Sequence, residues 1–176
     1  MKIIIGLGNK GKEYENTRHN LGFLCLDYLC NKYNLTINKK LKKSILGEAN
    51  INGEKVVFLK PETYMNLSGE AIVEVLNWYK EDISNVLVIY DDIDIPFETI
   101  RYKESGSAGT HNGMKDIINK LKTNNIARIR IGMGNLKHEK QDMVDFVLGR
   151  ISKEEESKLD EIFSNVDEKV NDWIKK

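Results

Sequence analysis

Few of the features that mark exported or membrane-spanning proteins occur in this sequence. It has only two cysteines, Cys25 and Cys30, which lie five positions apart on a predicted helix and therefore cannot form a disulfide with each other. Free thiols are typical of a reducing compartment, so we expect a cytoplasmic protein. No run of about eighteen apolar residues is present, and no signal peptide is recognisable at the N-terminus. We therefore expect neither export nor insertion into a membrane.

Net charge is also lacking, because 27 Lys and Arg residues balance 27 Asp and Glu residues. Affinity for a polyanion must then come from the distribution of charge. Basic residues are in excess at 31–60 and 100–130, whereas acidic residues dominate 81–98. The lysine-rich stretch 38–43 is more simply interpreted as a solvated surface than as a phosphate contact.

Histidine is scarce as well, and no histidine has the spacing to a cysteine that a metal site requires. We predict no metal requirement and no cofactor. With 176 residues and 40% hydrophobic content, the sequence is long enough for one domain spanning 1–176 and requires no second one. We expect a monomer without an obligate protein partner.

Hydrophobic patterns then predict the elements of the fold. Continuous apolar runs at 3–5 and 86–90 are typical of strands that are buried on both faces. Asn52-Gly53 between 45–51 and 55–59 predicts a hairpin, and 99–103 and 127–131 alternate like strands. Apolar residues at helical spacing predict helices at 20–33, 69–79, 114–121 and 152–174.

Three of these helices have candidate caps at their N-termini. Asn20 is expected to cap the first, Asn66 or Ser68 the second, and Ser152 with Glu155 forms a capping box for the last. The order of elements is βα, hairpin, α, β, β, α, β, α. This order predicts an α/β fold, a single-domain mixed β-sheet sandwiched between α-helices, with an inserted β-hairpin.

The loop after the first strand has two interpretations. Its residues 6–11, Gly-Leu-Gly-Asn-Lys-Gly, match the dinucleotide fingerprint G-x-G-x-x-G. That fingerprint needs a helix that opens at the glycines and a second parallel strand that ends in an acid. Here the helical pattern begins only near Asn20, and the next strands form a hairpin. A dinucleotide-dependent oxidoreductase is therefore the weaker interpretation.

The longer pattern at 6–23, Gly-Leu-Gly-Asn-x-Gly-x-x-Tyr-x-x-Thr-Arg-His-Asn-x-Gly-Phe, resembles the opening signature of bacterial peptidyl-tRNA hydrolases. The resemblance runs from Ile3 to about Gly149 and includes the motifs at 65–69, 91–96, 111–113 and 130–132. It implies hydrolysis of the ester between a peptide, or an N-blocked amino acid, and the 3′-terminal ribose of peptidyl-tRNA. Two positions depart from the family pattern: Lys10 stands where proline is usual, and Thr110 stands where glycine is common.

Hydrolysis of an ester requires a base that activates water, a group that holds this base in the useful tautomer, and donors for the oxyanion. His19 lies beside the end of the first strand, titrates near neutral pH, and matches the catalytic histidine of the family. Asp91, the first residue after the second central strand, can accept a hydrogen bond from its imidazole. We leave Asp92 and Asp94 out of the site.

Further candidates are amides and aromatic side chains in loops. By resemblance, Asn9, Asn66 and Asn112 line the peptide channel, and Asn9 helps to separate blocked from free aminoacyl esters. Tyr14 and Tyr64 can stack or form hydrogen bonds at the junction of peptide and adenosine. The resemblance assigns the substrate contact to Asn112 and not to the neighbouring His111.

Contacts to tRNA are predicted for Arg101, Lys103 and Arg130, which lie on strands near a glycine-rich loop. Residues 101 and 103 share one face of their strand. The alternative is a surface ladder that pairs with the acidic zone around Glu98. Basic patches alone also permit a second function, that of an RNA-binding relative without turnover.

Overall fold

The N-terminal apolar run forms the central strand β1 (Lys2–Gly6) of a seven-stranded mixed sheet. The computed structural model describes residues 1–176 and places the strands in the order β2-β3-β4-β1-β5-β7-β6. β1 pairs in parallel with β4 and β5, and β5 pairs in parallel with β7. The remaining strands are β2 (Lys39–Leu41), β3 (Ser44–Ile51), β4 (Glu54–Pro61), β5 (Val86–Pro96), β6 (Ile100–Lys103) and β7 (Ala127–Gly134).

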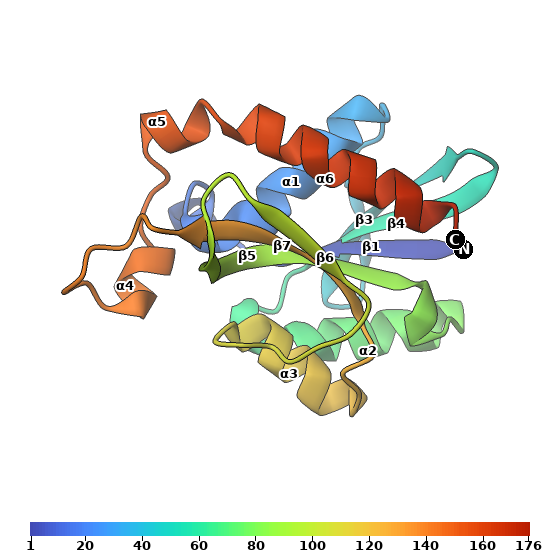
Figure 1. Ribbon diagram of the computed structural model, residues 1–176. Helices are drawn as coiled ribbons and strands as arrows, with labels where there is room; N and C mark the ends of the chain where they lie inside the picture. Colours follow the sequence, from blue (N-terminus) through green and yellow to red (C-terminus); the bar gives the residue numbers. More distant parts are fainter.

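Helices cover both faces of this sheet (Figure 1). One face packs against α1 (Leu21–Lys32) and α6 (Leu159–Ile174), and the other packs against α2 (Ser68–Tyr79) and α3 (Asn112–Leu121). The apolar side chains of β1 alternate between the two cores, because successive residues of a strand point to opposite faces. The predicted fold class, a mixed sheet between helices with a hairpin, is confirmed.

The hairpin of β3 and β4 turns at Asn52-Gly53, as predicted. Both residues have positive φ, 53° and 85°, which is the conformation that favours this pair of residues in a two-residue turn. β4 also pairs with β1, so the hairpin extends the main sheet and does not stand apart from it. The lysine-rich stretch contributes β2, a short edge strand that the sequence pattern did not predict.

Asp91 does not follow the second central strand, as we predicted, but lies within it. β5 continues to Pro96 because β7 keeps pairing with it: Asp91 lies opposite Ile131 and Asp92 opposite Gly132. Beyond Asp92 the register shifts, and pairing resumes at Pro96 with Gly134. A polar run therefore ends the apolar pattern before the strand itself ends.

The predicted last helix is interrupted. The capping box of Ser152 and Glu155 is present, but it begins a single short helix, α5 (Lys153–Glu156), which is followed by α6. The predicted apolar stripe of α6 is confirmed, since all its members are buried: Leu159, Ile162, Phe163, Val166, Val170, Trp173 and Ile174. A further short helix, α4 (Met143–Val147), was not predicted.

Two predicted caps are wrong. The side chain of Asn20 precedes α1 but makes no capping bond, and neither Asn66 nor Ser68 caps α2. At the start of α2, the N–H of Gly69 donates instead to Oδ2 of Asp116, at 2.8 Å, from the neighbouring helix α3. None of the helices is both long and apolar enough to cross a lipid bilayer.

Candidate active site

His19 and Asp91 meet where the parallel strands β1 and β5 lie side by side. His19 belongs to the short 3-10 helix η2 (Arg18–Asn20), which follows β1 after a loop and a first 3-10 turn, η1 (Lys12–Tyr14). Its Nδ1 lies 2.9 Å from Oδ2 of Asp91. Asp91 is only 3% exposed, so this hydrogen bond is shielded from water.

A second histidine, His111, binds the other oxygen of the same carboxylate. Its Nε2 lies 3.1 Å from Oδ1 of Asp91, and its Nδ1 accepts the backbone N–H of Met114 at 3.1 Å. Because Nδ1 is an acceptor, the ring proton of His111 sits on Nε2 and is donated to Asp91. Asp91 thus accepts from both rings, and the proton of neutral His19 sits on Nδ1. The lone pair of His19 is then on Nε2, where it can accept a proton.

Asp91 and the two histidines shift each other's protonation, so that the pKa of His19 rises and the pKa of Asp91 falls. Burial lowers the pKa of His19, but the charge of Asp91 and its hydrogen bond together raise that pKa by more, so the net shift is upward from 6.5. Burial also raises the pKa of Asp91, and the two histidines outweigh it, so the net shift is well below the usual range of a carboxyl group. Asp91 therefore stays ionised at neutral pH.

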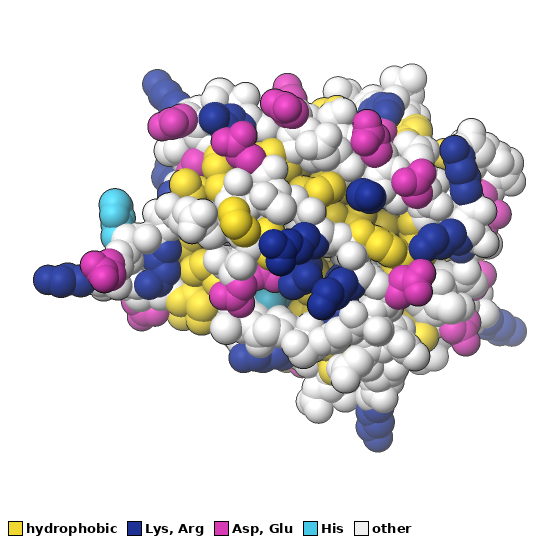
Figure 2. All heavy atoms as spheres, viewed as in Figure 1, with side chains coloured by type: hydrophobic (Ala, Val, Ile, Leu, Met, Phe, Trp, Pro, Cys, Tyr) yellow, Lys and Arg dark blue, Asp and Glu magenta, His cyan; other side chains and the backbone are white.

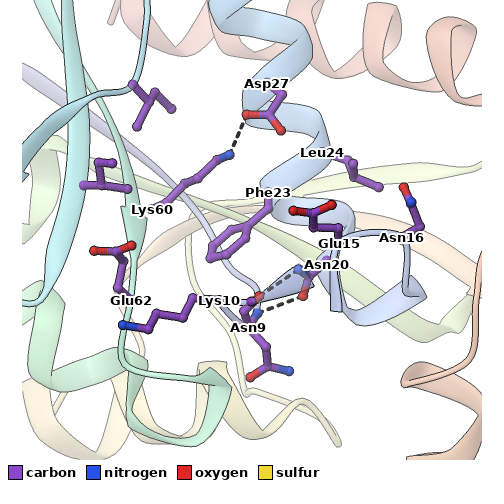
Figure 3. Close-up of a pocket in the computed structure, with 13 residues that line it drawn as sticks. Asn9, Lys10, Glu15, Asn16, Asn20, Phe23, Leu24, Asp27, Lys60 and Glu62 are labelled. Carbon is purple, nitrogen blue, oxygen red and sulfur yellow. Dashed lines mark hydrogen bonds and ion pairs between the residues drawn. The ribbon is translucent and has the colours of Figure 1, made fainter. Parts of the chain in front are cut away.

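Asn9 is held in place by Asn20, the residue that follows His19. Its backbone N–H donates to Oδ1 of Asn20 at 2.8 Å, and its backbone carbonyl accepts from Nδ2 of Asn20 at 2.9 Å (Figure 3). Its side-chain Oδ1 accepts the N–H of Met65 at 2.7 Å. The oxygen of the Asn9 amide is thus occupied, and its Nδ2 is left without a partner in the protein. Asn9 presents donors, not an acceptor, to a bound molecule.

The remaining amide candidates line two depressions, one of which contains His19. Asn112, the first residue of α3, lines a hollow together with His19, Asp91 and Thr110, and α4 supplies apolar side chains to the same hollow. Asn112 also lines a shallow depression with Asn66, which belongs to the 3-10 helix η3 (Met65–Leu67). Asn112 therefore joins the two depressions.

Tyr14 and Tyr64 come together as an edge-to-face pair, with ring centroids 6.4 Å apart. Tyr64 is 50% exposed and has a φ of 61°, which is strained for a residue other than glycine. Such strain is typical of functional sites, where the surrounding structure holds a residue in place. The pair offers an aromatic surface for a base or a sugar.

Metal coordination is the other use that these donors suggest. The nearest ligand atoms of His19, Asp91 and His111 lie within 4.8 Å of one another. The hydrogen bonds to Asp91 and from Met114 account for three of the four ring nitrogens and for both carboxylate oxygens. The absence of a metal requirement stays a prediction.

The family model for peptidyl-tRNA hydrolase matches residues 3–176. The chain belongs to the peptidyl-tRNA hydrolase family. The peptidyl-tRNA hydrolase of Alkaliphilus oremlandii is 47% identical over 175 residues, which cover 99% of this chain and 94% of the relative. That of Alkaliphilus metalliredigens is 52% identical over 155 residues, or 88% and 83% of the two chains. A crystal structure of peptidyl-tRNA hydrolase from Acinetobacter baumannii matches with a TM-score of 0.91 at 35% identity, covering 99% of this chain and 89% of that one.

Close packing explains Gly6 and Gly22 of the first motif without a dinucleotide. A Cβ atom at Gly6 would collide with the backbone oxygen of Gly22, and one at Gly22 would lie 2.5 Å from the backbone nitrogen of Leu7. These two glycines let α1 pack directly on β1. They do not form a turn at which a helix opens onto a phosphate, because α1 begins only at Leu21.

The predicted tRNA contacts lie at the β6 edge of the sheet. Arg101 pairs across the ladder with Arg130, and both Arg101 and Lys103 are exposed without an ion pair. Glu98, the proposed partner in the surface-ladder alternative, binds Lys158 instead, at 3.0 Å. Lys and Arg side chains gather over the middle of the face on which β6 and the following loop lie (Figure 2). Arg130 differs, since its guanidinium binds Asp92 at 3.3 Å.

Three site residues were missed or undervalued by sequence reasoning. Asn20 was assigned to helix capping and His111 was set aside, yet they hold Asn9 and Asp91. Arg18 received no role, yet it ties η2 to the C-terminal region through Glu155 at 3.0 Å and the carbonyl of Phe146 at 3.1 Å. Its place next to His19 in the motif was the only signal for it. Lys10 and Thr110, the two departures from the family pattern, both line depressions beside the site.

Proposed function

We propose that this protein hydrolyses the ester of peptidyl-tRNA with His19 as general base and Asp91 as its partner. The observation that carries the proposal is the bond from His19 Nδ1 to buried Asp91, which leaves Nε2 to accept a proton from water. His19 also lines a hollow that admits a small reactant.

The reaction follows from this arrangement. His19 Nε2 takes a proton from water while the hydroxide oxygen attacks the ester carbonyl carbon, and the charge moves to the carbonyl oxygen. Amide donors of Asn9 and Asn112 stabilise that oxyanion. When the intermediate collapses, the bond to the 3′ ribose oxygen breaks, and this oxygen takes the proton from the imidazolium. The products are a peptide with a free carboxylate and a tRNA with a free 3′-terminal ribose.

The preference for blocked esters rests on the orientation of Asn9. Because Met65 occupies Oδ1, the outward-facing part of Asn9 is a pair of N–H donors. These can bind the carbonyl oxygen of an N-acyl group or a peptide bond, whereas a free ammonium has only donors of its own. We propose that Asn66, Asn112, Tyr14 and Tyr64 hold the rest of the peptidyl-adenosine.

The tRNA stem is assigned to the β6 edge. Arg101, Lys103 and Arg130 are proposed to contact its phosphates, because two of the three are exposed basic side chains with no acidic partner. The protein is proposed to act as a monomer of one domain in the cytoplasm, without a cofactor. The two thiols that support a reducing compartment, Cys25 and Cys30, are free and buried.

The test compares one tRNA that carries either an N-acetylated or a free amino acid. We expect rapid release from the acetylated form only, and His19→Ala is expected to lower turnover by about 10²–10⁴-fold while binding of the acetylated substrate persists. Unfolding by urea serves as a control for the fold of the variant. Near wild-type hydrolysis by the variant would exclude His19 as the base, and tRNA binding without any hydrolysis would favour a non-catalytic RNA-binding protein.

A further inference from the structure

A groove lined by lysines lies on the side of Asn9 away from the β6 edge. Lys10, from the first loop, comes together there with Lys40 of β2 and with Lys42 and Lys43 of the β2–β3 turn. The other lining residues are two acids, Glu62 and Glu70, together with Thr63 and Leu67. The hollow has a volume of about 320 Å³. We call it the lysine groove.

Its positive charge is only partly compensated, because four lysines against two glutamates (4 − 2) leave the lining with a net charge of +2. Lys10, Lys40 and Lys42 are exposed and have no ion pair, whereas Lys43 binds Glu70 at 3.2 Å. Glu70 also binds Lys120, at 3.5 Å, so its charge is shared by two lysines. Lysines from two distant segments that outnumber the acids beside them repel each other, and an anionic ligand relieves that repulsion.

The groove adjoins the proposed site through the backbone. Lys10 follows Asn9 directly, and Figure 3 shows it extending away from the Asn9 amide towards the segment that carries Glu62. Thr63 and Leu67 flank the segment whose Met65 N–H binds Asn9. A chain bound at Asn9 therefore reaches the groove without crossing the protein.

The topology decides which end of the substrate enters it. β2 and β6 are the two edges of the sheet, and the strands that bring His19 and Asp91 together, β1 and β5, lie between them. The proposed function places tRNA over β6 and the ester at His19. The peptide must then leave on the β2 side, where the lysine groove lies.

We propose that the lysine groove binds acidic side chains of the nascent peptide a few residues upstream of the ester, a proposal that rests on the proposed function above. β2 is three strand spacings from β1, or about 14 Å at ~4.8 Å each. An extended peptide advances about 3.3 Å per residue. The lysines therefore contact about the third to fifth residue from the ester.

The experiment uses one tRNA that carries N-acetylated hexapeptides with Glu, Gln or Lys at the third to fifth positions from the ester. We expect the wild-type kcat/KM to rank Glu above Gln above Lys, with about 2–5-fold between Glu and Gln at low salt and less at high salt. In Lys10→Ala/Lys42→Ala the Glu-to-Gln ratio should fall to about one. The matched control, Lys169→Ala/Lys175→Ala, removes the same charge from exposed positions at α6 and its C-cap and should keep the wild-type ratio.

The N-acetyl-aminoacyl ester of the same tRNA separates the two proposals, because it is too short to reach the groove. If this ester is not cleaved, the proposed function fails. If it is cleaved but wild-type kcat/KM is equal for Glu and Gln peptides, the groove does not bind acidic side chains of the peptide. Equal losses of the double variant on the short and long substrates would mean that the lysines bind RNA, which would also overturn the proposal.

Discussion

At the scale of single residues, one buried carboxylate organises the site. Asp91 accepts one hydrogen bond with each oxygen, from His19 and from His111, and so fixes the tautomer of both rings. His111 in turn is locked by the N–H of Met114 at the start of α3. The catalytic proposal therefore depends on which atoms carry protons as much as on which residues are present.

Asp91→Asn should change the tautomer of His19 while keeping the shape of the side chain at position 91. The introduced amide would keep its oxygen towards His111 and turn its NH2 towards His19, which would move the proton of His19 to Nε2 and remove the base. We expect turnover to fall by about 10²–10⁴-fold with little change in substrate binding. Single-turnover hydrolysis and binding of the N-acetylated substrate, measured side by side, check this expectation.

The dependence of kcat/KM on pH tests whether Asp91 raises the pKa of His19. His19 works as a base only when unprotonated, so kcat/KM should rise with pH through an apparent pKa above 6.5. In Asp91→Asn the charge that raises this pKa is gone while the burial that lowers it remains, so the rising limb should move to lower pH. Profiles of kcat/KM against pH for both proteins test this, and an unmoved limb would make Asp91 purely structural.

Asn9 can be tested by exchanging its donor for an acceptor. Asn9→Asp keeps an oxygen for the N–H of Met65 and replaces the outward NH2 by negative charge, which attracts an ammonium. The ratio of N-acetyl to free aminoacyl ester hydrolysis should fall by about 2–10-fold, the range of one hydrogen bond. Asn9→Ala should also lower the ratio, but it leaves Met65 without its acceptor. A ratio that is unchanged in both variants would contradict the role of Asn9.

At the scale of elements, the C-terminal region supports the turn that carries His19. Arg18 of η2 reaches Glu155, which also closes the capping box of α5 by accepting the N–H of Ser152 at 2.7 Å. The guanidinium of Arg18 stacks on the ring of Phe146 at 4.4 Å, and the backbone N–H of Arg18 donates to the carbonyl of Gly149. Two segments more than a hundred residues apart in sequence thus share one ionic contact.

This contact predicts unequal effects for the two halves of the capping box. Ser152→Ala removes only a cap and should cost about 1 kcal/mol of the free energy of unfolding. Glu155→Ala removes the cap and also leaves the largely buried Arg18 without its ionic partner. It should therefore cost about 3–5 kcal/mol of the free energy of unfolding and lower kcat through displacement of His19. Urea unfolding and kcat measured for both variants are the test, and equal costs would mean that Arg18 adds nothing.

At the scale of the whole molecule, a protein without net charge is proposed to keep positive charge at two edges of the sheet, one for the phosphates of tRNA and one for acidic side chains of the peptide. The β6 edge carries Arg101 and Lys103, and the β2 edge carries the lysine groove. Both groups lie outside the catalytic hollow, so they can hold the substrate while the ester remains at His19.

If the β6 edge binds tRNA, KM should depend on salt concentration. If Arg101 and Lys103 contact phosphate, Arg101→Ala/Lys103→Ala should flatten the plot of log KM against log salt by about one unit per contact. An N-acetyl-aminoacyl adenosine, which lacks the tRNA stem, should show no such change. Equal losses on both substrates would assign these residues to the fold. Arg130 is omitted because its bond to Asp92 gives it a structural role as well.

Local patterns in the sequence were enough to predict most elements of the fold. Apolar runs indicated the central strands, Asn52-Gly53 indicated the hairpin, and the motif at 6–23 contained His19, the proposed base. These signals are local because strand burial, turn conformation and helical spacing depend on residues that are near neighbours in the chain.

The assembly of the site, in contrast, became visible only in three dimensions. The contacts of His111 with Asp91, of Asn9 with Met65 and of Arg18 with Glu155 join residues separated by 20, 56 and 137 positions. No periodicity encodes such contacts, since they arise when parallel strands bring distant loops to one edge of the sheet. For the same reason Asp91 lies inside β5, because pairing with β7 extends the strand past the end of its apolar run.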